Sequence, residues 1–302
     1  MSKQIDSDRA AELYSAALRD ISANTIGQAL RYFHSVPPSA LLKDPDKYFD
    51  EWFEIVDEAR QRAWNIGQAY YRLDTAIWTG TTPDDGTGEL LTLKQLWIYF
   101  LKRIGTKKFR SSLPNSEISL TDSVWDDYDL DYSRRNAAST YYTRAAYRLK
   151  KFEDASRLKE FVDKDDYLKQ LDKVMQTVTT DMARESQRLA HNGGRDAVLQ
   201  GAQNTKAKRV GYLRVPRGLY TCGFCIMLAS RGAIYNTKAS AGLKGVGREY
   251  HAGCDCEVRA IYEGQTLPAV NKQAEDAWKD FTRTKGGGAS DFNKWWAEKT
   301  NE

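Results

Sequence analysis

Hydrophobic residues in the first two thirds of the chain recur every three or four positions, a spacing typical of amphipathic helices. The pattern is clearest over residues 6–34 and 45–78, where apolar side chains form one stripe among charged ones. It returns over residues 90–104 and, at greater length, over 133–203, with a break near residues 164–166. We therefore predict a mainly helical N-terminal body.

The sequence His191-Asn192-Gly193-Gly194 falls inside the last of these helical segments. Glycine and asparagine readily adopt the left-handed backbone conformation that closes many helices. We therefore predict a helix end at this point. Residues 195–203 are expected to add no more than one further short turn.

The sequence pattern changes near residue 208, where β-branched, aromatic and turn residues begin to alternate. The runs 208–217, 233–235 and 257–262 each predict a short strand. We place a domain boundary at about residue 205. The predicted divisions are a helical body over 1–204, a small β-rich module over 205–266 and a C-terminal tail over 267–302. This organisation corresponds to the α+β fold class.

The tail contains two predicted helical segments separated by the glycines at 286–288. Ser290 can cap the last helix, in which Phe292, Trp295 and Trp296 fall on one face. Because three large aromatic side chains on about three turns cannot bury one another, we predict that this helix docks onto a partner protein. The alternative is that it packs back onto the helical body, since tryptophan is usually buried in folded proteins.

The net charge of +4 is unevenly distributed along the chain. Residues 197–248 contain nine lysines and arginines and no acidic residue, so the rest of the chain has a net charge of 4 − 9 = −5. A basic segment of this kind indicates contact with a polyanion, whereas a solvated basic surface is the alternative. The predicted nucleic-acid contacts are Lys206, Lys208, Arg209, Arg214 and Arg217.

All four cysteines lie between residues 222 and 256, close in sequence to a histidine. Two loops contain them: one with two cysteines three positions apart, the other with a histidine followed by two cysteines. Thiolate and imidazole groups spaced in this way are typical of a tetrahedral zinc site, because each short loop can place two ligands around one ion. The candidate ligands are Cys222, Cys225, His251, Cys254 and Cys256, which are five for four positions. We favour Cys222, Cys225 and Cys256, with either His251 or Cys254 as the fourth.

The cysteine pattern is compatible with three other kinds of site. Disulfide pairing is less favoured because a chain without a secretion signal stays reduced in a cytosol, although the cysteines could become oxidised after cell lysis. Thioredoxin-like chemistry is disfavoured because the sequence does not predict the Cys222-x-x-Cys225 pair at the start of a helix in a βαβ unit. A nucleophilic pair with His251 as base is possible in principle, but nothing distinguishes one cysteine as the nucleophile.

The cysteine-containing segment resembles the Mu F-like minor head proteins of tailed bacteriophages. The resemblance covers residues 209–262, where an upstream C-x-x-C pair is followed by a His-x-x-Cys-x-Cys element. The commoner form of that element has proline after the histidine and arginine between the cysteines. Ala252 and Asp255 occupy these positions here, which is similar to the variant found in phages of actinobacteria.

The resemblance implies a non-enzymatic minor capsid protein that acts in head morphogenesis, DNA packaging or DNA delivery. Its implied partners are the portal protein, the major capsid protein and packaged double-stranded DNA. Its implied location is the virion, with the host cytoplasm during assembly. No signal peptide and no membrane-spanning segment are predicted. The alternatives are a zinc-dependent enzyme (nuclease, head-maturation protease or ADP-ribosyl transferase) and a zinc-ribbon nucleic-acid-binding regulator. Known protease and phosphate-binding motifs are absent, so we expect no enzyme.

Overall fold

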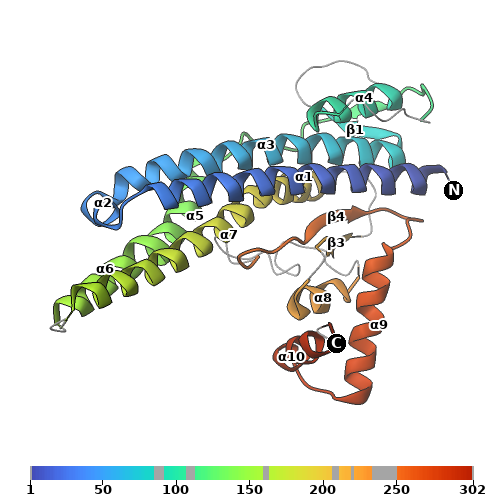
Figure 1. Cartoon of the computed structure of the whole chain (residues 1–302). Coiled ribbons are helices and arrows are strands. Elements are labelled where there is room, and N and C mark those ends of the chain that lie inside the picture. Colours follow the sequence, from blue (N-terminus) through green and yellow to red (C-terminus); the bar gives the residue numbers. More distant parts are fainter. Residues whose placement is uncertain are drawn as a thin grey trace.

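Three long helices, α1 (Ser2–Ser35), α3 (Pro45–Thr79) and α7 (Lys164–Asn204), pack side by side and form the body of the molecule (Figure 1). The short helix α2 (Pro38–Lys43) joins α1 to α3. The computed structural model describes residues 2–84, 92–106, 113–158, 163–205, 211–218, 221–232 and 250–300. The bounds of α1 and α3 confirm the first two helices that the hydrophobic pattern predicts.

The two ends of α3 are determined by local sequence. The side chain of Asp44 accepts a hydrogen bond from the backbone N–H of Lys47, and Pro45 occupies the first helical position. Proline is well suited to this position because its missing N–H would have no helical partner there. At the other end, Gly80 adopts the left-handed conformation with a φ of 74°. Glycine tolerates this conformation without a side-chain clash.

Helix α7 continues to Asn204, so the helix end predicted at residues 191–194 is wrong. A β-carbon on Gly193 would lie 2.0 Å from the carbonyl oxygen of Arg60 in α3. A β-carbon on Gly194 would lie 2.5 Å from the hydroxyl oxygen of Tyr14 in α1. The two glycines therefore permit a close approach of helices rather than a turn of the chain.

Smaller elements complete the body. They are β1 (Thr81–Pro83), α4 (Leu93–Arg103), β2 (Ser119–Thr121), α5 (Leu130–Tyr141), the π-helical turn η1 (Tyr142–Ala146) and α6 (Tyr147–Leu158). Strands β1 and β2 pair in parallel. Helix α4 begins with a capping box, in which Thr92 and Gln95 each bond the other's backbone N–H. Helix α6 ends at Leu158 and α7 begins at Lys164, so the break predicted near residues 164–166 lies at the start of α7.

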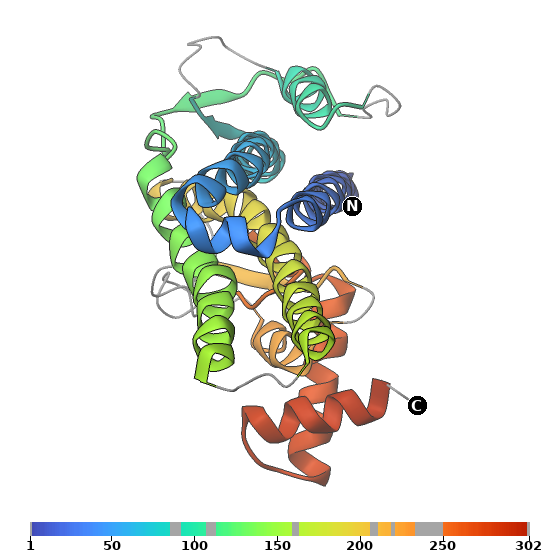
Figure 2. The ribbon, with the colours of Figure 1, turned by 60° about the vertical axis from the view of Figure 1, so that its left-hand side comes forward.

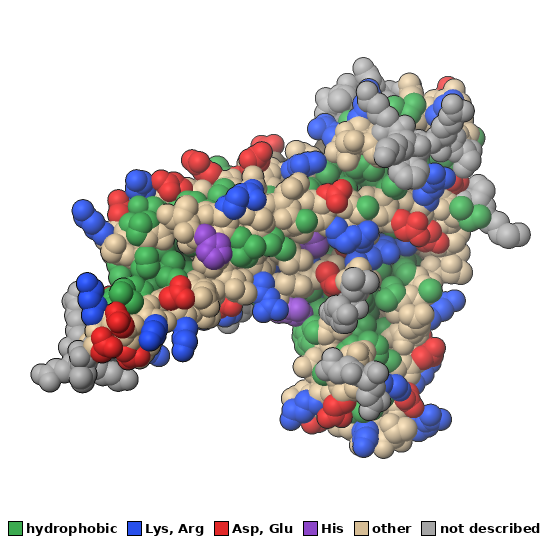
Figure 3. All heavy atoms as spheres, in the orientation of Figure 1, with side chains coloured by type: hydrophobic (Ala, Val, Ile, Leu, Met, Phe, Trp, Pro, Cys, Tyr) green, Lys and Arg blue, Asp and Glu red, His purple; other side chains and the backbone are tan. Residues whose placement is uncertain are grey.

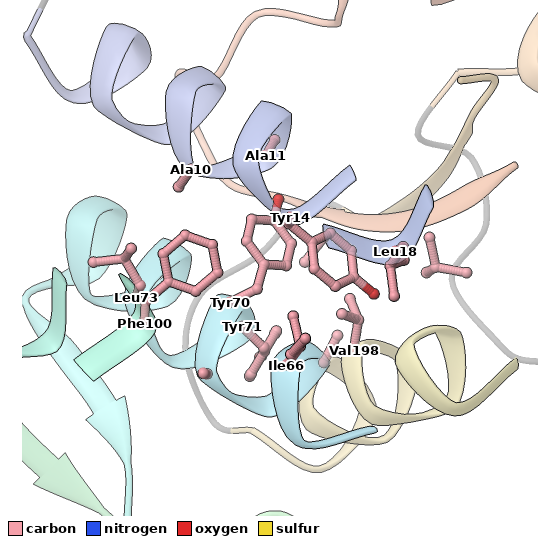
Figure 4. Close-up of a cluster of buried hydrophobic side chains, with 14 of the residues drawn as sticks. Ala10, Ala11, Tyr14, Leu18, Ile66, Tyr70, Tyr71, Leu73, Phe100 and Val198 are labelled. Carbon is pink, nitrogen blue, oxygen red and sulfur yellow. The ribbon is translucent and has the colours of Figure 1, made fainter. Parts of the chain in front are cut away.

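The core of the body is rich in tyrosine. Tyr14 of α1 stacks on Tyr70 of α3 with ring centroids 4.4 Å apart, and aliphatic side chains such as Ile66 and Val198 surround the pair (Figure 4). The same buried cluster extends into the C-terminal part of the chain, where it includes Cys256. The helical body and the cysteine-containing segment thus share one hydrophobic core.

The C-terminal module is built on a two-stranded sheet. Strand β3 (Gly211–Val215) pairs antiparallel with β4 (Glu257–Ile261), and every residue of both strands is buried. The short helix α8 (Gly223–Ala229) lies against the sheet on the side away from α1 and α3 (Figures 1 and 2). Two of the three predicted strands are confirmed, and the third, at 233–235, lies outside the described residues. Helical body and small sheet together confirm the α+β fold class.

The tail forms two helices, α9 (Ala269–Thr284) and α10 (Ala289–Thr300). Phe292 is completely buried, with its ring 5.3 Å from that of Phe281 and 5.0 Å from that of Trp278. The indole of Trp296 donates to the backbone oxygen of Thr221, just before α8. Phe292 is thus buried inside the chain, against the expectation that the aromatic residues of the tail need a partner protein, while Trp295 and Trp296 are half-buried. Helix α10 packs on α8 and α9. Docking onto a partner protein stays a prediction.

The face of the molecule in Figure 3 has acidic and basic side chains intermixed over the long helices, with no extended patch of one sign. No helix in the part of the chain that the structure describes has the length and apolar character needed to cross a membrane.

Candidate metal centre

Two loops bring the cysteines together. Cys222 is the residue that precedes the first turn of α8, and Cys225 lies within that turn. In the second loop, the backbone N–H of Cys254 bonds the carbonyl oxygen of His251, and Gly253 takes a φ of 73° to make this tight turn. Cys256 immediately precedes β4. Helix α8 and strand β4 therefore hold the two halves of the predicted ligand set.

The five predicted donor atoms form two groups that share the sulfur of Cys225. Cys222, Cys225 and His251 form the first group, and Cys225, Cys254 and Cys256 form the second. Within each group the donor atoms all lie within 4.8 Å of one another. Cys225, Cys254 and Cys256 are buried, while the rim of the site is formed by Cys222 and the exposed His251.

The spacing of these atoms fits a zinc ion. Zn–S bonds of about 2.3 Å and Zn–N bonds of about 2.0 Å around a tetrahedral centre place neighbouring donor atoms about 3.5 to 3.8 Å apart. The Sγ atoms of Cys225 and Cys254 are 3.6 Å apart. The Nε2 atom of His251 lies 3.5 Å from Cys225 Sγ and 3.0 Å from Cys222 Sγ. The cluster could therefore hold a metal ion with little rearrangement.

The charges of these side chains also suit a bound cation. Hydrogen bonds from Cys225, and then from His251, lower the pKa of Cys222 to about 4. The Cys222 thiolate in turn raises the pKa of His251 to about 9. A thiolate thus faces an imidazolium at neutral pH, and a bound metal ion would take the place of the imidazolium proton. None of the four cysteines forms a disulfide in this structure.

The position of the Cys222-x-x-Cys225 pair differs from expectation in one respect. The pair does lie at the start of a helix, contrary to the sequence-based argument against redox chemistry. However, α8 has only seven residues, and the flanking strands β3 and β4 are antiparallel. The βαβ unit of thioredoxin-like proteins, which needs parallel strands, is therefore not the setting of this pair.

Of the five predicted nucleic-acid contacts, the structure describes Arg214 and Arg217. Lys206, Lys208 and Arg209 lie outside the described residues. Arg214 is buried, with its guanidinium carbon 4.2 Å from the centroid of the Tyr250 ring. Arg214 therefore lies against the residue that precedes His251, whereas the charge pattern predicts an arginine on the surface.

Arg217, the fifth predicted contact, pairs with Glu257 at 3.2 Å. The carboxylate of Glu257 is buried and also accepts a hydrogen bond from Ser15 of α1. Arg217 therefore balances a buried charge between the module and the body, and this role explains its place in the fold without a phosphate partner.

One residue of the site is absent from the sequence-based set. Arg195 of α7 donates to the backbone oxygens of Cys254 and Cys256, both at 2.8 Å. A lone arginine inside a helix, about sixty positions from its partners, has no local signal that would reveal this role.

A known protein family and a phage protein are similar in sequence to this chain. The model of the family described as "VG15 protein" matches residues 130–281, from α5 to α9, which is about half of the chain. The "Gene 15 protein" of Mycobacterium phage D29 is 28% identical over an alignment covering 35% of this chain and 49% of the relative. The chain thus aligns with about half the length of that relative, and no solved structure matches. Both findings indicate a phage protein. The extent of the family match shows that the chain belongs to the VG15 protein family.

Proposed function

We propose that this protein is a structural minor head protein of a tailed-phage virion, associated with the portal or the inner capsid. The observation that supports this most is the family match, which covers α5 to α7 of the helical body together with the cysteine module. The relative from Mycobacterium phage D29 has the same association with a phage. The Mu F-like resemblance of residues 209–262 suggests a role in head morphogenesis, DNA packaging or DNA delivery.

The metal in this proposal is one structural zinc ion per chain. Cys222, Cys225 and Cys256 would hold it together with His251 or Cys254, and the ion would join α8 to the loop before β4. A structural zinc ion contributes folding energy directly. Sites rich in thiolates are typically closed, without the open position for water that a hydrolytic zinc needs. We therefore propose that the protein is not an enzyme.

The basic segment supplies the proposed contact with packaged DNA. Of the five arginines and lysines assigned to it, Lys206, Lys208 and Arg209 remain candidates for this contact. Arg214 and Arg217 have partners inside the protein. Contacts of lysine and arginine with phosphate are independent of base sequence, which suits a protein that lies near any part of a packaged genome.

The proposal is tested on virions of the phage that encodes this chain. Quantitative mass spectrometry of gradient-purified particles should find the protein in full heads, at far fewer copies than the major capsid protein. A phage with a nonsense codon in this gene should give incomplete or non-infectious heads in a non-suppressing host. Abundant protein in the lysate, absent from particles at every stage of assembly, would contradict the proposal and favour a regulator or an enzyme.

A further inference from the structure

Arg195 is a buried cation on the body side of the metal centre. Only 2% of its surface is exposed, and all three donor nitrogens of its guanidinium group have acceptors. Its Nε donates to the carbonyl oxygen of Cys256 and one Nη to that of Cys254, while the other Nη donates to Asn192. One side chain of the helical body thus holds two candidate ligand residues by their backbone.

A second buried cation lies next to the same loop. The ring centroid of Tyr250 is 3.7 Å from the guanidinium carbon of Arg195 and 4.2 Å from that of Arg214. Tyr250 directly precedes His251 in the chain, and all three side chains of this group are at least 95% buried. Two guanidinium groups therefore share one aromatic ring beside the thiols.

Such an arrangement requires a negative charge nearby. Burial of an unpaired cation is strongly unfavourable. The carboxylates of Glu257 and Asp255 interact electrostatically with Arg195, but among the residues that the structure describes neither forms a direct ion pair with it. A zinc ion with three thiolates and one imidazole has a net charge of −1, and one with four thiolates has −2. The occupied metal centre would therefore add its own negative charge next to Arg195.

We propose that Arg195 is a positioning residue of the metal centre: it orients the Cys254–Cys256 loop and offsets the negative charge of the bound cluster. This inference rests on the proposed zinc site. Because Arg195 belongs to α7, metal binding by the module depends on its contact with the helical body. Removal of a group that hydrogen-bonds to metal-ligating residues typically lowers metal affinity about 10- to 100-fold.

The test compares full-length wild type with Arg195→Gln and Arg195→Lys. Zn²⁺ affinity is measured by chelator competition, and Co²⁺ is used as a spectroscopic probe of the ligand geometry. We expect Arg195→Gln to bind Zn²⁺ at least about tenfold more weakly and to show altered Co²⁺ bands. Arg195→Lys keeps the charge but not the forked geometry. We expect it to recover part of the lost affinity while its Co²⁺ spectrum stays altered.

Arg188→Gln is the matched control, because Arg188 is a buried arginine of the same helix that pairs with Glu185 and not with the cluster. It should lower thermal stability yet leave Zn²⁺ affinity within about twofold of wild type. Wild-type affinity and spectra in Arg195→Gln would overturn the role of Arg195 without affecting the proposed zinc site. An equal loss of Zn²⁺ affinity in Arg188→Gln would do the same. If Arg195→Gln does not fold, wild-type affinity and spectrum in Arg195→Lys would overturn it. A wild-type protein that binds no metal would overturn the proposed zinc site and this inference together.

Discussion

At the scale of single residues, several polar groups are buried where their protonation matters for folding. His191 of α7 is an example, since only 2% of its surface is exposed. Its Nε2 lies 3.2 Å from the backbone oxygen of Leu18, which can only accept, so this nitrogen holds the proton. Burial, and then the neighbouring charge of Arg195, lower the pKa of His191 to about 3. The histidine is therefore neutral in the folded protein at all moderate pH values.

This shift predicts a pH dependence of stability. In the unfolded state His191 has an ordinary pKa of about 6.5. Below this pH the unfolded protein binds a proton that the folded protein does not bind. Stability is therefore complete above pH 6.5 and decreases as pH falls towards 3. Between pH 7 and pH 5 we expect His191 to lower the free energy of unfolding by about 2 kcal/mol.

Denaturant unfolding at several pH values should show a shallower decrease in His191→Gln than in wild type. The control is His34→Gln, since His34 is exposed at the end of α1. This variant should follow the wild-type profile. Parallel curves for wild type and His191→Gln would contradict the assignment of a neutral buried histidine.

At the scale of elements, the helical pattern predicts α1, α3, α4 and the region of α5 to α7 because each helix buries one stripe. The same local pattern does not predict that the helix continues through Gly193. A glycine pair is equally suitable for a helix end and for a close crossing of helices. Only the position of α3, a partner distant in sequence, decides between them. The tail shows the same limit, since its partner α8 is too short to be recognised by periodicity.

The crossing at Gly193 predicts opposite effects for one substitution at two sites. Gly193→Ala should destabilise the protein by about 1 to 3 kcal/mol or more, because the added methyl group would overlap the backbone of Arg60. Gly27→Ala in α1 should be neutral or stabilise by up to about 1 kcal/mol, since only the mobile end of Arg31 is nearby, at 3.4 Å. Thermal unfolding of both variants measures the difference. Equal melting temperatures would show that α7 does not cross α3 at this glycine.

The tail provides a second prediction for an element. Phe292→Ala should lower the free energy of unfolding by about 3 to 5 kcal/mol, because Phe292 fills the contact between α8, α9 and α10. Lys294→Ala, on the exposed face of the same helix, should change it by less than about 0.5 kcal/mol. A Phe292→Ala protein with unchanged stability but lost incorporation into heads would support docking onto a partner as the role of this helix.

At the scale of the whole molecule, the sequence pattern separates a helical body from a β-rich module but does not reveal that they share a core. Tyr212, Cys256 and Tyr262 belong to the same buried cluster as Tyr14 of α1. Short-range spacing was enough to identify the five candidate ligands because they lie in two compact loops. Arg195 could not be found in this way, since its partners meet it only after folding.

The shared core predicts one unfolding transition rather than two. Circular dichroism of the helices and tryptophan fluorescence should report the same midpoint in the metal-loaded protein. Removal of the metal by a chelator, or Cys256→Ser, should lower that midpoint for both signals together, because loss of the module exposes the core of the body. Two separate transitions, with the helices unaffected by chelation, would mean that the body is stable without the module.

The metal content of the full-length protein shows most directly whether the cysteine cluster is a metal centre. The protein should be purified under reducing conditions without a chelator, and zinc and free thiols should be counted in the same sample. We expect about one zinc ion per wild-type chain. The double variant with both Cys222→Ser and Cys225→Ser should bind none. A wild-type protein without metal whose four cysteines form two disulfides would contradict the assignment of a metal centre.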